Sequence, residues 1–356
     1  MRYGSTSRLA RYLAVAYGLL IAYASLHPFT GWRHSGTPWL AFLGADWPRY
    51  FTYTDLTLNT LAYLPLGFLL MPALRTRFKA GWAFLLTALI GALFSLGMEI
   101  IQNALPSRVP SNTDVACNTV GTLLGALAGG RWGGIFADGT WLHRWRMRRV
   151  IPGQPGEMGL ILLGLWLLAQ LNPESLLFGT GEIARYLEVP SPVEFSAERF
   201  QQAEFAVAAS QTFAVGLLGW RCMNHRSRSI LVAVLLLSLA VRTLATAVLQ
   251  AGVSPLHWAT PGNLAGFASG AAALILALLL PAAAQRILAT LALIAGALLV
   301  NMAPENPYLL EELSTWKQGH FLNFNGLTRL TSSLWPYLAL IWLLSLRPVL
   351  PKSKKH

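Results

Sequence analysis

The chain contains 356 residues, of which 54% are hydrophobic and only 12% are charged, and its mean hydropathy is +0.48. Soluble globular proteins carry about 25% charged residues, so this composition excludes the ordinary soluble classes. The net charge of +12 would favour nucleic-acid binding in a soluble protein. Here the concentration of Lys and Arg in alternate loops explains the charge better, and we expect no nucleic-acid partner.

Apolar runs of about 20 residues, the length needed to cross a bilayer, recur along the whole chain. They predict an all-α, polytopic helical membrane protein with about ten transmembrane helices. The first run is not followed by a signal-peptide cleavage site and a polar domain, so we expect it to be retained as a span. The predicted spans are residues 9–27, 55–74, 82–104, 113–131, 158–171, 204–221, 229–251, 262–281, 286–302 and 331–346.

Basic residues fall in every second connecting segment, with the densest group at residues 144–149. Because loops rich in Lys and Arg stay on the cytoplasmic side, this pattern places both termini in the cytoplasm. We expect a multi-pass protein of the cell (inner or plasma) membrane. The loop around residues 106–111 would then lie at the outer face.

Polar residues gather where the third and fourth predicted spans meet. Glu99 and Gln102 are three residues apart and share one helix face. Asp114 and Asn118 share a face of the next helix, and Arg108 lies in the loop between the two helices. The second span brings a further polar stripe, at steps of four, to the same end. The candidate ligand-binding residues are Asp55, Asn59, Tyr63, Glu99, Gln102, Arg108, Asp114 and Asn118.

Two interpretations of this polar set stay open. In one it is a structural clasp, in which Arg108 pairs with Glu99 or Asp114. In the other it is a pocket at the outer leaflet that binds a lipid headgroup or a sugar-phosphate, because three acids, one Arg and several amides exceed what a clasp requires. No spaced His or Cys signature indicates a metal, and we expect no cofactor. No nucleophile motif identifies a catalytic residue.

At these residues the chain resembles the VanZ-like family of integral membrane proteins, named for a teicoplanin-resistance protein. The resemblance covers residues 1–130. It implies a membrane protein whose named member suggests altered access of a lipid-anchored glycopeptide to the cell surface. Its marks are Leu26-His27-Pro28-Phe29, Asp55 and Asn59 ahead of Tyr63-Leu64-Pro65-Leu66-Gly67-Phe68, Glu99-x-x-Gln102, Pro106-x-Arg108, Asp114, Asn118-x-x-Gly121 and Gly125.

Spacings in the first four predicted spans recur later in the chain, which predicts a pseudo-repeat of four, four and two spans. The matching positions are Asn118, Gly121 and Gly125 with Asn263, Gly266 and Gly270, and Asp55 and Gly67 with Glu204 and Gly216. The predicted domains are a VanZ-like four-helix unit at 1–130, a basic cytoplasmic loop at 131–157, a degenerate second four-helix unit at 158–282, and a two-helix partial repeat with a basic tail at 283–356.

The leading hypothesis is a non-catalytic membrane protein that binds a lipid or glycolipid headgroup at the outer leaflet. Such binding would modulate the cell envelope or its sensitivity to glycopeptide antibiotics. The expected partners are membrane lipids, including a lipid-linked glycan or a lipoglycopeptide. Two alternatives stay open: a transporter or flippase of a lipid-linked anion, which Arg242 inside a span favours, and a membrane enzyme that uses Glu99 as acid or base.

Overall fold

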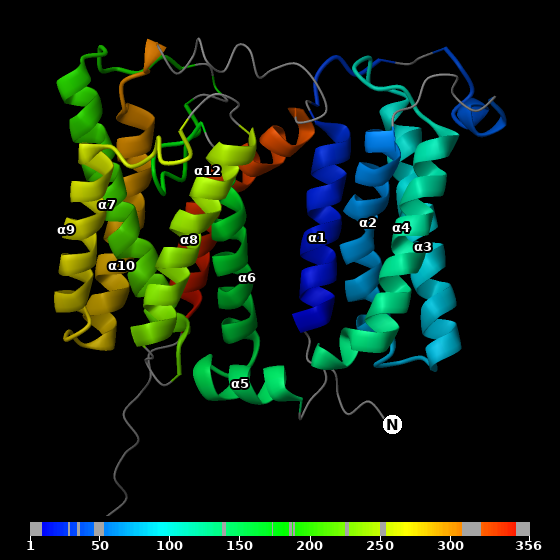
Figure 1. The fold of residues 1–356 in the computed structure, drawn as a ribbon, viewed down its shortest axis with the longest axis horizontal. Helices are drawn as coiled ribbons and strands as arrows, with labels where there is room; N and C mark the ends of the chain where they lie inside the picture. Colours follow the sequence, from blue (N-terminus) through cyan, green and yellow to red (C-terminus); the bar gives the residue numbers. More distant parts are fainter. Residues whose placement is uncertain are drawn as a thin grey trace, which may run out of the picture. The chain divides into compact units, whose positions relative to one another are not determined.

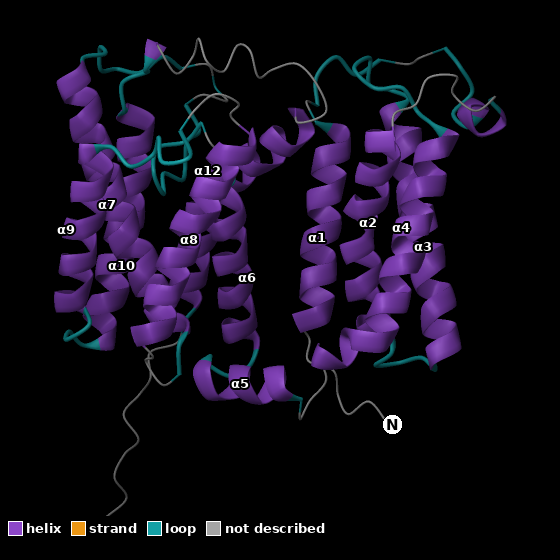
Figure 2. Cartoon of the chain, in the orientation of Figure 1, coloured by secondary structure: helices purple, strands orange, loops and turns teal. Residues whose placement is uncertain are grey.

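The structure is a computed structural model that describes residues 9–27, 29–33, 36–45, 53–136, 140–172, 174–184, 187, 189–224, 228–249, 254–307 and 322–346. Of residues 53–55, 142, 248–249 and 322–325 it describes the backbone but not the side chains. In this part of the chain the regular structure is helical and no strand occurs (Figure 2), apart from one isolated antiparallel bridge between Val150 and Met223. The predicted all-α class is therefore confirmed.

The chain divides into two compact units, Met1–Arg148 and Arg149–His356. In the first unit α2 is central and packs against α1, α3 and α4, which together form a bundle (Figure 1). Its elements are α1 (Leu9–Leu26), the 3-10 helix η1 (Ala41–Gly44), α2 (Tyr53–Leu74), α3 (Ala80–Gln102), α4 (Asn112–Trp132), the 3-10 helix η2 (Gly133–Phe136) and α5 (Trp141–Arg149), whose last residue belongs to the second unit.

In the second unit α7 is central and packs against α6, α8, α9 and α10. Its elements are α6 (Gln154–Ala169), α7 (Ala197–Cys222), α8 (Arg228–Leu249), α9 (Pro261–Ala277), α10 (Ala282–Met302) and α12 (Leu322–Ser345). The fully buried Trp166 of α6 anchors the core, with ring centroids 5.2 Å from Phe178 and 6.4 Å from Trp335. The segment 131–157, expected to be a connecting loop, contains η2, α5 and the first residues of α6.

Helix α7 begins seven residues earlier than the predicted start at residue 204. The hydroxyl of Ser196 accepts a hydrogen bond from the backbone N–H of Arg199, at 3.2 Å, and so caps the helix. The first two turns carry polar side chains, including Glu198 and Gln202, which hydropathy alone does not assign to a membrane span.

A helix occupies each of the ten predicted ranges, but not all ten helices are equally suited to cross a membrane. Within the described residues, five are long and apolar enough: Leu9–Leu26, Leu56–Leu74, Ala80–Gln102, Arg228–Ala247 and Ala282–Met302. Helices α6 and α9 are apolar but shorter. The chain therefore has the helices of a membrane protein, while the number of spans and the pseudo-repeat stay predictions.

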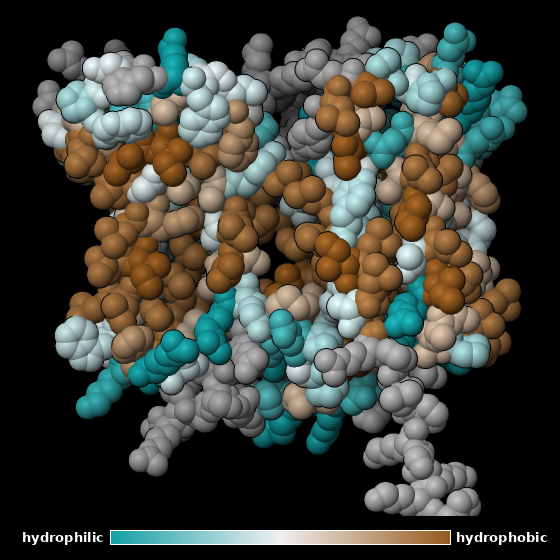
Figure 3. Space-filling model, turned by 180° about the vertical axis from the view of Figure 1, so that it is seen from behind, coloured by the Kyte–Doolittle hydropathy of each residue, from teal (hydrophilic) through white to brown (hydrophobic). Residues whose placement is uncertain are grey.

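The outer surface of α3 is apolar. Leu85, Leu89 and Leu93 follow one another at steps of four and are 57%, 52% and 57% exposed. Brown, hydrophobic side chains cover the middle of the helices, while teal, hydrophilic side chains lie toward their ends (Figure 3). Exposed apolar surface of this kind matches contact with lipid rather than water.

The closest helix contact in the first unit joins α2 to α4 through glycine. A Cβ atom added to Gly121 would lie 2.1 Å from the carbonyl oxygen of Thr60, and one added to Gly125 would lie 2.0 Å from that of Leu64. Gly67 of α2 approaches the carbonyl oxygen of Thr122 equally closely, at 2.1 Å from its added Cβ. Small residues let membrane helices approach until their backbones touch, and here no side chain larger than hydrogen fits.

We predict that Gly125→Ala separates α2 from α4 and destabilises the protein, by about 1–3 kcal/mol or more, because the new methyl group meets backbone atoms that cannot move aside. Thermal unfolding of the full-length protein in detergent measures the effect. Gly97→Ala in α3 is the matched control, since nothing lies within 4 Å of its added Cβ. That change should be neutral or stabilising. Equal melting temperatures for the two variants would refute the contact.

Candidate functional site

The closed end of the α3–α4 hairpin holds a buried carboxylate. Glu99, in the last turn of α3, is 4% exposed. The backbone N–H of Ser111 donates a hydrogen bond to Glu99 Oε2 at 2.9 Å. Ser111 is the N-cap of α4, and its own hydroxyl accepts from the backbone N–H of Thr113 at 3.2 Å. The carboxylate therefore lies at the positive end of the α4 dipole, which stabilises its charge.

Arg108 ties the hairpin loop to the end of α1. Its Nη2 donates hydrogen bonds to the carbonyl oxygens of His27, at 2.8 Å, and Ala24, at 3.4 Å. Burial lowers the pKa of the Arg108 guanidinium below its usual value, and the nearby Glu99 charge opposes that shift. The last carbonyls of a helix have no partner within the helix, so the guanidinium satisfies groups that would otherwise be left open.

Gln102 binds the same turn of α1. Its Nε2 donates a hydrogen bond to the carbonyl oxygen of Ser25 at 2.7 Å. Gln102 and Arg108 thus reach α1 from opposite sides of the loop that follows α3, and both bind main-chain oxygens. The observed contacts of these two residues hold helices together.

A second group of polar side chains lies deeper in the bundle. Asn118 of α4 is 6% exposed, and its Nδ2 donates a hydrogen bond to Ser95 Oγ of α3 at 2.9 Å. Tyr63 of α2 is 3% exposed, and its hydroxyl lies beside Ser95 without forming a hydrogen bond of normal geometry. Glu99 and Asp114 are within electrostatic range of this hydroxyl.

The structure thus brings six of the eight predicted residues into one region: Tyr63, Glu99, Gln102, Arg108, Asp114 and Asn118. Asn59 is half-buried and lies one turn before Tyr63 on α2. The backbone of Asp55 belongs to α2, but its side chain lies outside the described part of the chain. That these residues bind a ligand stays a prediction.

Sequence reasoning did not include Ser95, and it considered Ser111 only as a nucleophile and not as a helix cap, although both shape this region. Ser95 precedes Glu99 by four residues on α3, a spacing that places both on one helix face and could have identified it. Ser111 lies directly before a helix with Asp in its first turn, which is an N-cap signal. The carbonyl oxygens of α1 had no such signal, because main-chain atoms are the same at every residue.

The second unit contains its own buried carboxylate. Glu204 of α7 is 6% exposed and accepts hydrogen bonds from Thr260 Oγ1, at 2.8 Å, and Asn263 Nδ2, at 3.1 Å. In α8 the buried Arg242 donates to the carbonyl oxygens of Asn172 and Ser175, beyond the end of α6. Arg242 therefore fastens the end of α6, as Arg108 fastens the end of α1.

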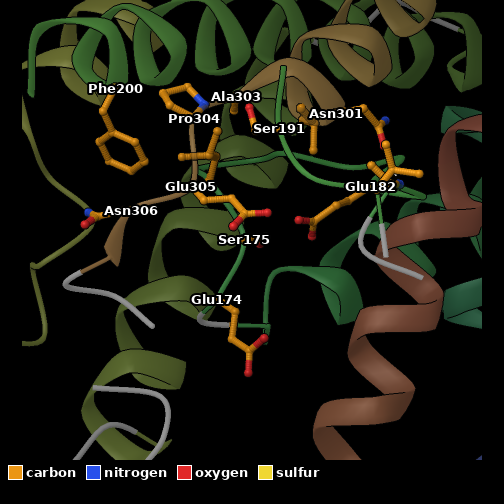
Figure 4. A pocket seen from close by; sticks show the side chains of 14 residues that line it. Glu174, Ser175, Glu182, Ser191, Phe200, Asn301, Ala303, Pro304, Glu305 and Asn306 are labelled. Carbon is orange, nitrogen blue, oxygen red and sulfur yellow. The ribbon is translucent and has the colours of Figure 1, made fainter. Parts of the chain in front are cut away.

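A cavity of about 80 Å³ opens among the loops of the second unit, and none of the predicted site residues lines it. The carboxylates of Glu182 and Glu305 point toward one another, while that of Glu174 points away (Figure 4). Throughout the described ranges, no group of three or more His, Cys, Asp or Glu side chains is arranged to hold a metal ion.

We predict that Arg108→Ala loosens the last turn of α1. Hydrogen bonds from a charged donor contribute roughly 1.5–3 kcal/mol each, so thermal stability should fall measurably. Backbone hydrogen exchange should rise at residues 24–27. Arg77→Ala, in the exposed turn between α2 and α3, is the control and should change stability by less than about 0.5 kcal/mol. Unchanged exchange in α1 would contradict the assignment.

The comparisons with known proteins agree with the resemblance in the first unit. Residues 5–130 match the model of the VanZ/LLP1 family, which confirms that this part of the chain is VanZ-like. The match covers α1 to α3, α4 as far as residue 130 and all of the polar region, and it ends before the second unit. No curated protein and no solved structure was found to match the chain.

Proposed function

We propose that the VanZ-like unit binds a lipid or glycolipid headgroup at the closed end of the α3–α4 hairpin. In doing so it would modulate the cell envelope, including its sensitivity to glycopeptide antibiotics. Glu99 carries the proposal. The residue is 4% exposed, and a hydrogen bond from the Ser111 backbone holds its carboxylate at the closed end of the hairpin, near the charges of Arg108 and Asp114. A buried carboxylate in a membrane helix is costly and indicates a functional site.

The other contacts support the same proposal. Glu99 and Asp114 are two acids close enough to interact, in the same partly buried region as Arg108 and Gln102. Like charges at short range repel and are retained where they serve a site. An incoming headgroup that donates hydrogen bonds would relieve this repulsion.

The alternative functions receive less support. Arg242, the residue that favoured transport, makes main-chain hydrogen bonds at the end of α6, which is a structural role. Catalysis by Glu99 as acid or base requires a reacting partner, and among the side chains that the structure describes around Glu99 we identify no candidate. We therefore propose binding without catalysis.

We also propose that the headgroup site faces outward from the cell membrane and that both termini are cytoplasmic. In the first unit the turn with Arg75, Arg77 and Lys79 joins α2 to α3, at the opposite end of these helices from Glu99. Basic turns stay in the cytoplasm, so the carboxylate end would face outside.

Cysteine labelling tests this orientation. In a chain with Cys117 and Cys222 replaced by Ala, Val109→Cys should react with a membrane-impermeant maleimide added to intact cells, because Val109 is 87% exposed. Arg77→Cys should react only after the cells are opened. Residue 77 is preferable to 146 as the inner reporter, since Arg146 is only 9% exposed. Labelling of 77 but not 109 in intact cells would reverse the proposed orientation.

Glu99→Gln separates binding from a structural role. We predict loss of the envelope phenotype, measured as teicoplanin or detergent sensitivity, with an unchanged amount of membrane-inserted protein. The substitution keeps size and removes a charge that costs up to a few kcal/mol in a membrane helix. Were the carboxylate a structural partner of Arg108, its loss would instead destabilise the protein by roughly 3–5 kcal/mol.

Two further variants complete this experiment. Asp114→Asn should behave as Glu99→Gln does, because both carboxylates belong to the proposed site. Glu198→Gln, an exposed carboxylate in the first turn of α7, is the control and should change neither readout. The binding proposal fails if the phenotype of both site variants declines only in proportion to protein abundance.

A further inference from the structure

Two of the polar atoms deep in the first unit form no hydrogen bond of normal geometry with the described residues. They are the hydroxyl of Tyr63, which lies beside Ser95, and the amide oxygen Oδ1 of Asn118. Both side chains are more than nine-tenths buried. Buried polar groups are almost always hydrogen-bonded, since leaving one open is destabilising. These two atoms therefore indicate a group that joins them from outside the chain.

The two atoms belong to side chains that meet at Ser95. Asn118 Nδ2 donates to Ser95 Oγ at 2.9 Å, and the Tyr63 hydroxyl lies beside the same serine. Three helices contribute, with Tyr63 from α2, Ser95 from α3 and Asn118 from α4. We call these residues the Tyr63–Ser95–Asn118 cluster.

The hydrogen-bonding chemistry of the cluster restricts what can bind there. Asn118 Oδ1 is an acceptor only, whereas the Tyr63 hydroxyl can donate or accept. A ligand hydroxyl can donate a hydrogen bond to Asn118 Oδ1 and accept one from the Tyr63 hydroxyl. A phosphate oxygen accepts but has no proton to donate to Asn118. The Glu99 and Asp114 carboxylates, within electrostatic range of Tyr63, would also repel a phosphate and accept from a hydroxyl.

We propose that the Tyr63–Ser95–Asn118 cluster binds a hydroxyl of the ligand, so that the headgroup is a sugar or another polyol and not a phosphate. This inference rests on the proposed function and names its ligand class. Ser95 and Glu99 are four residues apart on α3, or about 6 Å along the helix axis. A polyol that contacts Glu99 can therefore place a second hydroxyl at the cluster.

Two lipids with the same acyl chains test the proposal on the full-length protein in detergent micelles. Monoglucosyl diacylglycerol offers hydroxyls without charge, and phosphatidic acid offers a phosphate without sugar. The wild type should bind the glucosyl lipid more tightly. Tyr63→Phe removes only the hydroxyl and should weaken that binding roughly tenfold, the effect of one hydrogen bond. It should leave phosphatidic acid binding and the melting temperature of the lipid-free protein unchanged.

Tyr17→Phe is the matched control. The Tyr17 hydroxyl of α1 donates to the carbonyl oxygen of Ala62 at 2.9 Å, so its hydrogen bond is made within the protein. Its removal should lower the melting temperature and leave the lipid preference as it is. Tyr63→Phe should therefore change lipid binding alone, and Tyr17→Phe should change stability alone.

Three results would overturn the inference, and each has a different meaning. Tyr63→Phe could lower the melting temperature of the lipid-free protein without weakening the binding of the glucosyl lipid. In that case a bound water, and not a ligand hydroxyl, is the partner of Tyr63. If the wild type prefers phosphatidic acid, and Glu99→Gln alters that binding, headgroup binding stands and the polyol assignment fails. If neither lipid binds the wild type, the proposed function fails as well.

Discussion

The first unit depends on the contact between α2 and α4, where two backbones touch through glycine. In a lipid environment the hydrophobic effect does not drive helices together, so shape and close contact must do so. Gly121 and Gly125 fix the two helices against the carbonyls of Thr60 and Leu64. Tyr63 lies between those two residues in sequence, so the same contact sets how far its hydroxyl stands from α4. The close contact between α2 and α4 therefore determines the geometry of the candidate polar site.

The second unit contains the same kind of contact between α7 and α9. Added Cβ atoms on Gly266 and Gly270 would lie 2.4 Å from the carbonyl oxygens of Phe205 and Ala209. This register places Phe205 where the first unit has Thr60. Glu204 then corresponds to Asn59, whereas the spacing to Gly216 in the sequence had matched it with Asp55. Two glycine contacts are compatible with a repeated unit, and they show that spacing along one helix does not determine which residues face a neighbour.

The all-α class and a helix in each of the ten ranges could be predicted from the sequence, because hydropathy and helical periodicity are local properties. The proximity of Glu99, Arg108 and Asp114 could be predicted because they lie at the end where two consecutive helices meet. The contacts themselves could not be predicted. One of the two interpretations paired Arg108 with a carboxylate, but neither indicated that it donates hydrogen bonds to carbonyl oxygens of α1. A residue's own position does not reveal whether main-chain atoms or side chains lie within its reach. The early start of α7 was missed because hydropathy locates only the apolar part of a helix, whereas the Ser196 cap extends α7 into a polar stretch.

The attachment of α1 through its carbonyl oxygens also has an evolutionary consequence. Every residue carries the same carbonyl, so Arg108 and Gln102 would hold the end of α1 whatever side chains stand at residues 24, 25 and 27. Substitutions there are compatible with this attachment, but insertions and deletions are not. One residue added within α1 would rotate its last turn by about 100° and carry all three carbonyls away from their donors. Homologues that keep this attachment should therefore agree in the length of α1, whether or not they keep its side chains.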